Sequence, residues 1–129
     1  MLEGLRILLL EDEFLIAMDV ELQCREHGAA DVSTARTLYE VGDLAGFNAA
    51  ILDIFVDGAS TLDFADTLRG AGTPFVFASG HTDNVEIAMR FPDVTLVGKP
   101  YAGNDLVEAL AIACGRVPAV SDADPAGAA

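Results

Sequence analysis

Short apolar runs alternate with longer amphipathic segments along residues 1–115. Each run is of strand length and is bounded by polar or glycine residues, which is typical of buried parallel strands. The segments between them repeat apolar residues every three or four positions, as helices do. The pattern predicts five strands, at 5–10, 31–35, 49–55, 74–78 and 94–97, and five helices, at 13–27, 37–44, 61–69, 83–90 and 104–114.

Gly28 is expected just after the end of the first helix, and Asn104 is expected at the N-cap of the last. The spacing of apolar residues also predicts the apolar side of three helices. The apolar residues are Leu15, Met18 and Leu22 on one face of the first helix, Leu62, Ala65 and Leu68 facing inward in the third, and Leu106, Leu110 and Ala113 facing inward in the last.

This strand–helix alternation predicts an α/β fold with a doubly wound parallel sheet, because parallel strands need crossover connections that place helices on both faces. A chain of 129 residues suits one domain, expected at 1–115. Residues 116–129 are rich in Ala, Pro, Asp and Gly, and we expect a mobile tail there.

Composition narrows the class of protein. Hydrophobic residues make up 52% of the chain, and the net charge is −14, which argues against direct binding of nucleic acid. No apolar run is long enough to span a membrane and no signal peptide is evident, so we expect a cytoplasmic protein. Cys24 and Cys114 form no CxxC motif and are expected to be reduced core thiols.

Polar side chains gather where the predicted strands end. Glu11 and Asp12 follow the first strand, Asp53 lies near the end of the third, Ser79 follows the fourth and Lys99 follows the fifth. Ligands of doubly wound sheets bind beyond the carboxyl ends of the strands. Three carboxylates at close range favour Mg²⁺, a hard cation that takes oxygen ligands.

These groups predict phosphoryl transfer. Asp53 is the expected nucleophile, because a lone carboxylate in an apolar strand requires a compensating charge such as a metal or Lys99. Mg²⁺, the Lys99 ammonium and the Ser79 hydroxyl are each suited to one phosphoryl oxygen. We expect Glu13 to be an acid at a helix start and not a metal ligand.

The sequence resembles the receiver domain of two-component response regulators, with LLEDE at 9–13, LDI at 52–54, FASG at 77–80 and KP at 99–100 in the family's order and spacing. The resemblance implies a flavodoxin-like (βα)5 fold with strand order 2-1-3-4-5, which is the usual order of flavodoxin-like sheets. It also implies roles for individual residues: Asp53 as phosphoacceptor, Glu11, Asp12, Asp53 and the main-chain carbonyl of Phe55 as Mg²⁺ ligands, and Ser79 and Lys99 as phosphoryl contacts.

The chain departs from the family pattern at a position linked to switching. Leu96 stands where the family often has Tyr or Phe, so His81 or Tyr101 is expected to report phosphorylation instead, and a cis peptide is implied before Pro100. FASGH also resembles a subgroup with a Phe-Ala-Thr-Gly-aromatic fourth strand, whose next helix is short. We therefore expect a mobile segment over 81–91.

The leading hypothesis is a single-domain response regulator that is not a conventional enzyme. It would take phosphoryl from a sensor histidine kinase or phosphotransfer protein and signal through a downstream protein, or serve as a phosphate sink or relay. An Mg²⁺-dependent phosphohydrolase is the alternative, although Phe55 stands where such enzymes place a second acid. A flavin carrier is disfavoured, because residues 11–13 would repel its phosphate.

Overall fold

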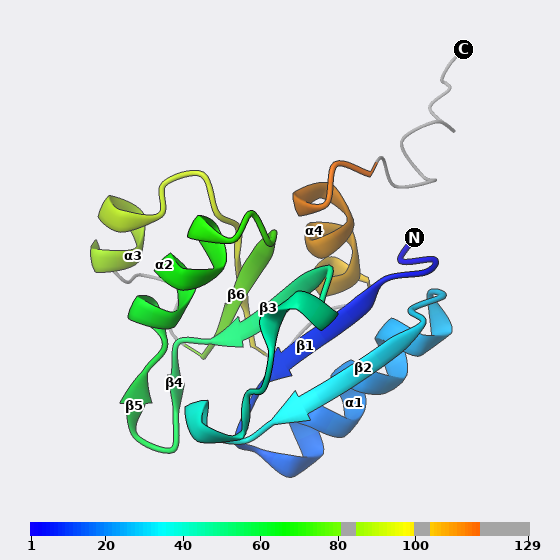
Figure 1. The fold of residues 1–129 in the computed structure, drawn as a ribbon, viewed down its shortest axis with the longest axis horizontal. Coiled ribbons are helices and arrows are strands. Elements are labelled where there is room, and N and C mark those ends of the chain that lie inside the picture. The colour runs from blue at the N-terminus through cyan, green and yellow to red at the C-terminus, as the bar shows by residue number, and fades with distance from the viewer. Residues whose placement is uncertain (81–84, 100–103, 117–129) are drawn as a thin grey trace.

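A five-stranded parallel sheet forms the centre of the computed structural model, which describes residues 1–80, 85–99 and 104–116 (Figure 1). The strand order is β2-β1-β3-β6-β7. Along the chain this is the predicted order 2-1-3-4-5, so the doubly wound, flavodoxin-like fold is confirmed. The strands are β1 (Arg6–Leu10), β2 (Asp31–Ala35), β3 (Ala49–Asp53), β6 (Phe75–Ser79) and β7 (Leu96–Gly98).

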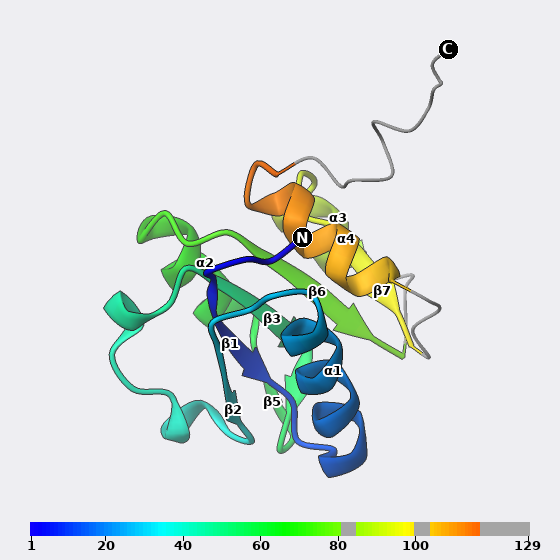
Figure 2. The same cartoon turned by 90° about the vertical axis from the view of Figure 1, so that its right-hand side faces the viewer.

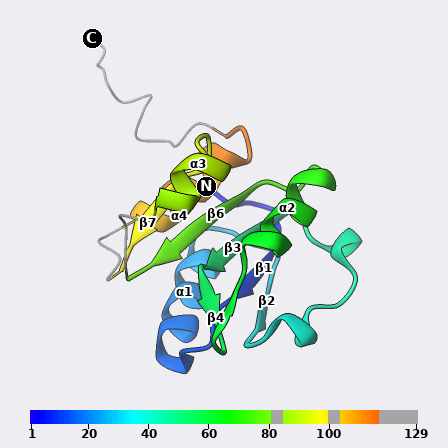
Figure 3. The same cartoon turned by 90° about the vertical axis from the view of Figure 1, so that its left-hand side faces the viewer.

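Helices cover both faces of the sheet. Helices α1 (Phe14–Glu26) and α4 (Asp105–Ala113) lie on one face, which is turned to the viewer in Figure 2. Helices α2 (Leu62–Gly70) and α3 (Val85–Arg90) lie on the other (Figure 3). Successive residues of a strand point to opposite faces, so Leu9 packs under α1 and α4 while Leu8 packs under α2 and α3.

The connection from β2 to β3 differs from the prediction. Two 3-10 turns, η1 (Leu38–Glu40) and η2 (Leu44–Gly46), replace the helix expected at 37–44, so the described chain has four α-helices and not five. Apolar residues recur here every third position, which suits three residues per turn better than 3.6. The partly buried residues of this repeat are Leu38, Val41, Leu44 and Phe47.

The exposed side of α1 is a second difference. Leu15, Met18 and Leu22 share one face, but their exposed fractions are 77%, 52% and 56%. The helix instead buries a stripe of smaller side chains, which lets it approach the sheet closely. The buried residues of α1 are Ala17, Val20 and Cys24. Burial raises the pKa of the Cys24 thiol to about 12. Cys24 lies in the core, as predicted, whereas Cys114 is only partly buried.

The orientation of α1 can be tested by measuring the free energy of unfolding of two variants. Leu15→Gln is expected to change the free energy of unfolding by less than about 0.5 kcal/mol, because the side chain is already in solvent. Val20→Ala, five residues further along the helix, is expected to cost at least about 1 kcal/mol, because it removes buried methyl groups. Urea unfolding followed by far-UV circular dichroism measures both. A larger loss for Leu15→Gln would contradict the observed orientation.

Other helix predictions hold with one exception. In α2 the predicted inward residues are buried, and in α4 Leu106 and Leu110 are buried while Ala113 is exposed. At about 100° per residue Ala113 lies on the same side of the helix as Leu106. It is exposed because it is the last residue of α4, where it lines a concavity. Asn104 occupies the N-cap of α4 but makes no capping bond, since its Oδ1 lies 3.3 Å from His27 Nε2.

Helix α3 is short, as the resemblance implies, and Pro92 follows close after its end. Its carboxyl end is anchored by Ile87 and Phe91, which are 3% and 1% exposed. Arg90 forms ion pairs with Asp63 and Asp66 of α2. Mobility over 81–91 stays a prediction, since 81–84 lie outside the described residues. No helix of the described chain is long and apolar enough to cross a membrane.

Candidate functional site

The site lies at the carboxyl edge of the sheet, where β1, β3 and β7 end. Glu11 and Asp12 follow β1, Asp53 is the last residue of β3, and Lys99 follows β7. The parallel pairing of neighbouring strands brings these ends to one edge (Figure 1). The Glu11 N–H donates to the carbonyl of Ala35 at 3.0 Å, which extends the pairing of β1 with β2 and holds Glu11 in the interior.

Three carboxylates converge there, as the sequence predicts. One oxygen each from Glu11, Asp12 and Asp53 lies within 4.8 Å of the others. Glu11 is 2% exposed and the other two are half-buried. A cluster of oxygen donors of this size and charge fits one hard divalent cation such as Mg²⁺.

Glu13 lies outside this cluster. It occupies the N-cap position of α1 and is exposed. Its N–H donates to Glu11 Oε2 at 3.0 Å. Glu13 therefore starts the helix, as predicted, and contributes to the site through its backbone.

Lys99 bridges two of the carboxylates. Its Nζ donates to Glu11 Oε1 and to Asp53 Oδ2, each at 2.8 Å. Burial disfavours the ammonium, but the hydrogen bonds to Asp53 and Glu11 outweigh burial and raise the pKa of Lys99. Burial also raises the pKa of Glu11 above its ordinary value of 4.5, against opposing hydrogen bonds from Lys99 and from the Glu13 N–H.

A small hairpin follows Asp53 and departs from the prediction that β3 continues through Phe55. Strand β3 ends at Asp53, and β4 (Phe55–Val56) pairs antiparallel with β5 (Ala59–Ser60). Asp57 and Gly58 form the turn, both with positive φ (51° and 78°), as a type I′ hairpin turn requires. The Asp57 N–H donates to Asp12 Oδ2 at 2.8 Å.

Of the remaining predicted site residues, Ser79, Leu96 and Phe55 lie in strands of the described structure. Ser79 ends β6 and is 5% exposed, and its carbonyl accepts the Lys99 N–H at 2.8 Å. Leu96 begins β7 and is partly buried. The Phe55 side chain is 57% exposed, so its predicted contribution is through the main chain. The other three predicted residues, His81, Pro100 and Tyr101, lie outside the described residues.

Two contacts at the site were not predicted. The Thr61 hydroxyl donates to the carbonyl of Asp53 at 2.5 Å, and the Asp57 N–H binds Asp12 as described above. Both join residues that are separated by a loop, so apolar periodicity carries no signal for them. The only sequence signal is a threonine immediately before a predicted apolar helix face.

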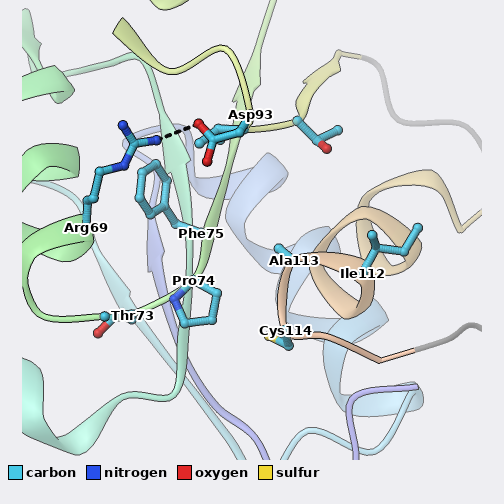
Figure 4. Close-up of a pocket in the computed structure, with 11 residues that line it drawn as sticks. Arg69, Thr73, Pro74, Phe75, Asp93, Ile112, Ala113 and Cys114 are labelled. Carbon is cyan, nitrogen blue, oxygen red and sulfur yellow. Dashed lines mark hydrogen bonds and ion pairs between the residues drawn. The ribbon is translucent and has the colours of Figure 1, made fainter.

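A concavity of about 540 Å³ lies away from these residues, beside the start of β6 and the end of α4 (Figure 4). Pro74, Phe75, Ile112 and Cys114 contribute to its wall. The wall also carries an ion pair from Arg69 to Asp93 at 2.8 Å. Since β6 begins at this edge and ends at the acidic edge, the concavity is separate from the carboxylate cluster.

The fold is a doubly wound α/β domain, and its carboxyl edge holds an acidic cluster bridged by a lysine. These features define a class of α/β proteins with a candidate cation site, and solved structures identify the family. SdrG from Pseudomonas melonis Fr1, in its BeF3-activated conformation, is 36% identical, with 86% of this chain and 97% of that chain covered and a TM-score of 0.67. A response regulator receiver protein from Sinorhizobium medicae WSM419 is 23% identical over 89% and 98% of the two chains, with a TM-score of 0.72.

The anti-anti-sigma factor PhyR from Bartonella quintana is 28% identical over 96% of this chain and 50% of that one, with a TM-score of 0.67. No protein-family model and no curated protein sequence matches the chain. The structural matches show that the chain belongs to the response regulator receiver domains of two-component signalling. This family consists of regulators and not of conventional enzymes.

Proposed function

We propose that Asp53 accepts a phosphoryl group from a histidine kinase or phosphotransfer protein. The observation that carries this proposal is the pair of 2.8 Å hydrogen bonds from Lys99 to Asp53 and Glu11, beside the three converging carboxylates. A half-buried carboxylate beside one fixed cation and a candidate metal site is suited to act as a nucleophile.

The proposed step exchanges one bond to phosphorus for another. An Asp53 carboxylate oxygen attacks the phosphorus of phosphohistidine, the P–N bond breaks, and its electron pair stays on the imidazole. Lys99, already bonded to Asp53, is placed to neutralise a phosphoryl oxygen, and Ser79 ends the neighbouring strand on the same edge.

The proposed metal ligands are Glu11, Asp12, Asp53 and the main-chain carbonyl of Phe55. When bound, Mg²⁺ would neutralise charge on the transferring phosphoryl group. Glu11 and Asp12 are held for this role by backbone N–H donors, from Glu13 and Asp57 respectively. Such outer-shell hydrogen bonds orient metal ligands.

The proposed output is a change in protein binding at the surface of α3, β7 and α4. β7 is an edge strand that pairs only with β6 within the described chain. A groove of about 390 Å³ lies beside it, and Leu96, Ile112, Asp105 and Glu108 are among the residues that line it. Val85 and Met89 of α3 are 70% and 77% exposed. A downstream protein that contacts this surface would read the phosphorylation state.

A phosphorylation assay tests the proposal. The protein is incubated with a small-molecule phosphodonor and Mg²⁺, and its intact mass is measured. We expect a gain of one phosphoryl group in the wild type, none in Asp53→Asn, and the wild-type gain in Asp63→Asn. Asp63 is an exposed acid in the first turn of α2, so it controls for the loss of a carboxylate.

Two results would count against the proposal. An adduct that persists in Asp53→Asn would place the phosphoryl group elsewhere. Continuous release of phosphate from a phosphate ester, without dependence on an added donor protein, would favour the phosphohydrolase alternative.

A further inference from the structure

The buried residue Thr61 makes an unusual set of hydrogen bonds beside the candidate phosphoacceptor. Its side chain is 0% exposed, and its hydroxyl lies 2.5 Å from the carbonyl oxygen of Asp53 and 3.1 Å from that of Ile54. Its backbone N–H also donates to Ile54 O, at 2.8 Å. One hydroxyl proton is therefore shared between two consecutive carbonyls.

Thr61 stands at the N-cap of α2, where a threonine hydroxyl ordinarily binds the free N–H groups of the first turn. Here the hydroxyl makes no such bond. Ser60 Oγ accepts the Leu62 N–H at 3.2 Å instead. The Thr61 hydroxyl is thus directed to the end of β3 and is not required to cap the helix.

The two accepting carbonyls belong to the two peptide units between the α-carbons of Asp53 and Phe55. Because each peptide unit is planar, holding its carbonyl fixes the orientation of the whole unit. The direction in which the Asp53 side chain leaves the backbone then depends on Thr61, and so does the start of β4 at Phe55. These two positions carry two of the four proposed metal ligands.

We propose that Thr61 is a positioning residue for the metal and phosphoryl site, an inference that rests on the function proposed above. It acts through the Asp53 and Ile54 carbonyls and touches neither metal nor phosphoryl group. The hairpin between Asp53 and Thr61 is held at its base by this hydroxyl and at its turn by the bond from Asp57 to Asp12. Thr61 thereby fixes one side of the acidic cluster relative to the other.

Four variants of the full chain test the inference: Thr61→Val, Thr61→Ala, Thr61→Ser and Thr67→Val. Thr67 is the matched control, because it lies in the same helix, is exposed, and donates to a backbone carbonyl, that of Asp63, at 3.4 Å. Mg²⁺ affinity is measured by isothermal titration calorimetry, and Tm by circular dichroism without metal. Thr61→Val is expected to weaken Mg²⁺ binding by about 10- to 100-fold, the range for lost outer-shell partners.

Thr61→Ser, which keeps the hydroxyl, is expected to restore affinity close to wild type, and Thr67→Val to leave it unchanged. In the metal-free protein, the carbonyl ¹³C shifts of Asp53 and Ile54 are expected to move in Thr61→Val and not in Thr67→Val. These readouts separate positioning from a general loss of stability, which would lower Tm without changing the affinity of the folded fraction.

Several outcomes overturn the inference. Unchanged Mg²⁺ affinity in Thr61→Val, with the wild type binding, would overturn it while leaving the proposed function in place. Failure of both Thr61→Val and Thr61→Ala to fold would do the same, because the hydroxyl would then serve the fold itself. A wild type that neither binds Mg²⁺ nor gains phosphoryl at Asp53 would overturn the proposed function and this inference together.

Discussion

Asp12→Ala is expected to weaken Mg²⁺ binding by more than about 100-fold, whereas Glu13→Ala, one residue along, leaves it near the wild-type value. Loss of an outer-shell partner alone costs about 10- to 100-fold, and Asp12 is proposed as a direct ligand. Its carboxylate belongs to the acidic cluster and is oriented by the Asp57 N–H at 2.8 Å. Glu13 is exposed and contributes only its backbone N–H, which Ala retains.

Calorimetric titration with Mg²⁺ and the intact-mass phosphorylation assay measure the two variants side by side. Phosphoryl incorporation at Asp53 is expected to fall with metal affinity in Asp12→Ala and to persist in Glu13→Ala. Both substitutions remove one negative charge from adjacent positions, so the general field of an acidic protein cannot account for a difference between them. A greater loss in Glu13→Ala would contradict this division of the three acids.

The arrangement of the sheet was predictable because it depends on features that repeat along the chain. Apolar strands of similar length, joined by helical crossovers, admit few topologies. The orientation of α1 was not predictable in the same way, because this helix carries two apolar stripes. The larger side chains, such as Leu15, are exposed, while Ala17 and Val20 face the sheet. Which stripe packs inward depends on the distance between helix and sheet, and local periodicity does not encode that distance.

In the candidate site, the residues at strand ends were predictable and the contacts from loops were not. Glu11, Asp12, Asp53 and Lys99 were predicted because the carboxyl ends of parallel strands meet at one edge. The contacts that hold them there come from the backbone of the hairpin at Asp57 and from the Thr61 hydroxyl. These contacts depend on a turn with positive φ and on a threonine hydroxyl that bonds to strand carbonyls. Neither feature produces a periodic pattern of apolar residues in the sequence. The sequence therefore predicted which polar groups gather at this edge, but not the contacts that orient them.

Lys99→Met is expected to lower the free energy of unfolding of the metal-free protein by about 3–5 kcal/mol at neutral pH, the usual cost of removing one partner from a buried ion pair. Lys99 is the only lysine of the chain, and its ammonium contacts both Glu11 and Asp53. The Glu11 side chain is only 2% exposed, so without Lys99 its negative charge is left buried with no cation bonded to it.

The loss of unfolding free energy in Lys99→Met is expected to depend on pH, and the ionisation of Glu11 determines the direction of this dependence. Burial raises the pKa of folded Glu11 above its ordinary value of 4.5, and removing Lys99 removes a contact that lowers it. A raised carboxyl pKa stabilises the fold below the unfolded pKa, and that stability is lost as pH rises through the folded pKa. The raised pKa of Lys99 keeps its ammonium charged throughout this range, so the wild type retains the bridge. The deficit of Lys99→Met is therefore smallest below about pH 4.5 and grows toward neutrality.

Urea unfolding in the presence of a chelator, followed by far-UV circular dichroism from acid to neutral pH, measures this dependence. Arg36→Met is the matched control, because it removes one positive charge from an exposed position. Adding Glu11→Gln to Lys99→Met is expected to recover part of the loss at neutral pH, since the buried carboxylate is then gone. A deficit that does not vary with pH, or one equal to that of Arg36→Met, would show that Lys99 does not compensate Glu11.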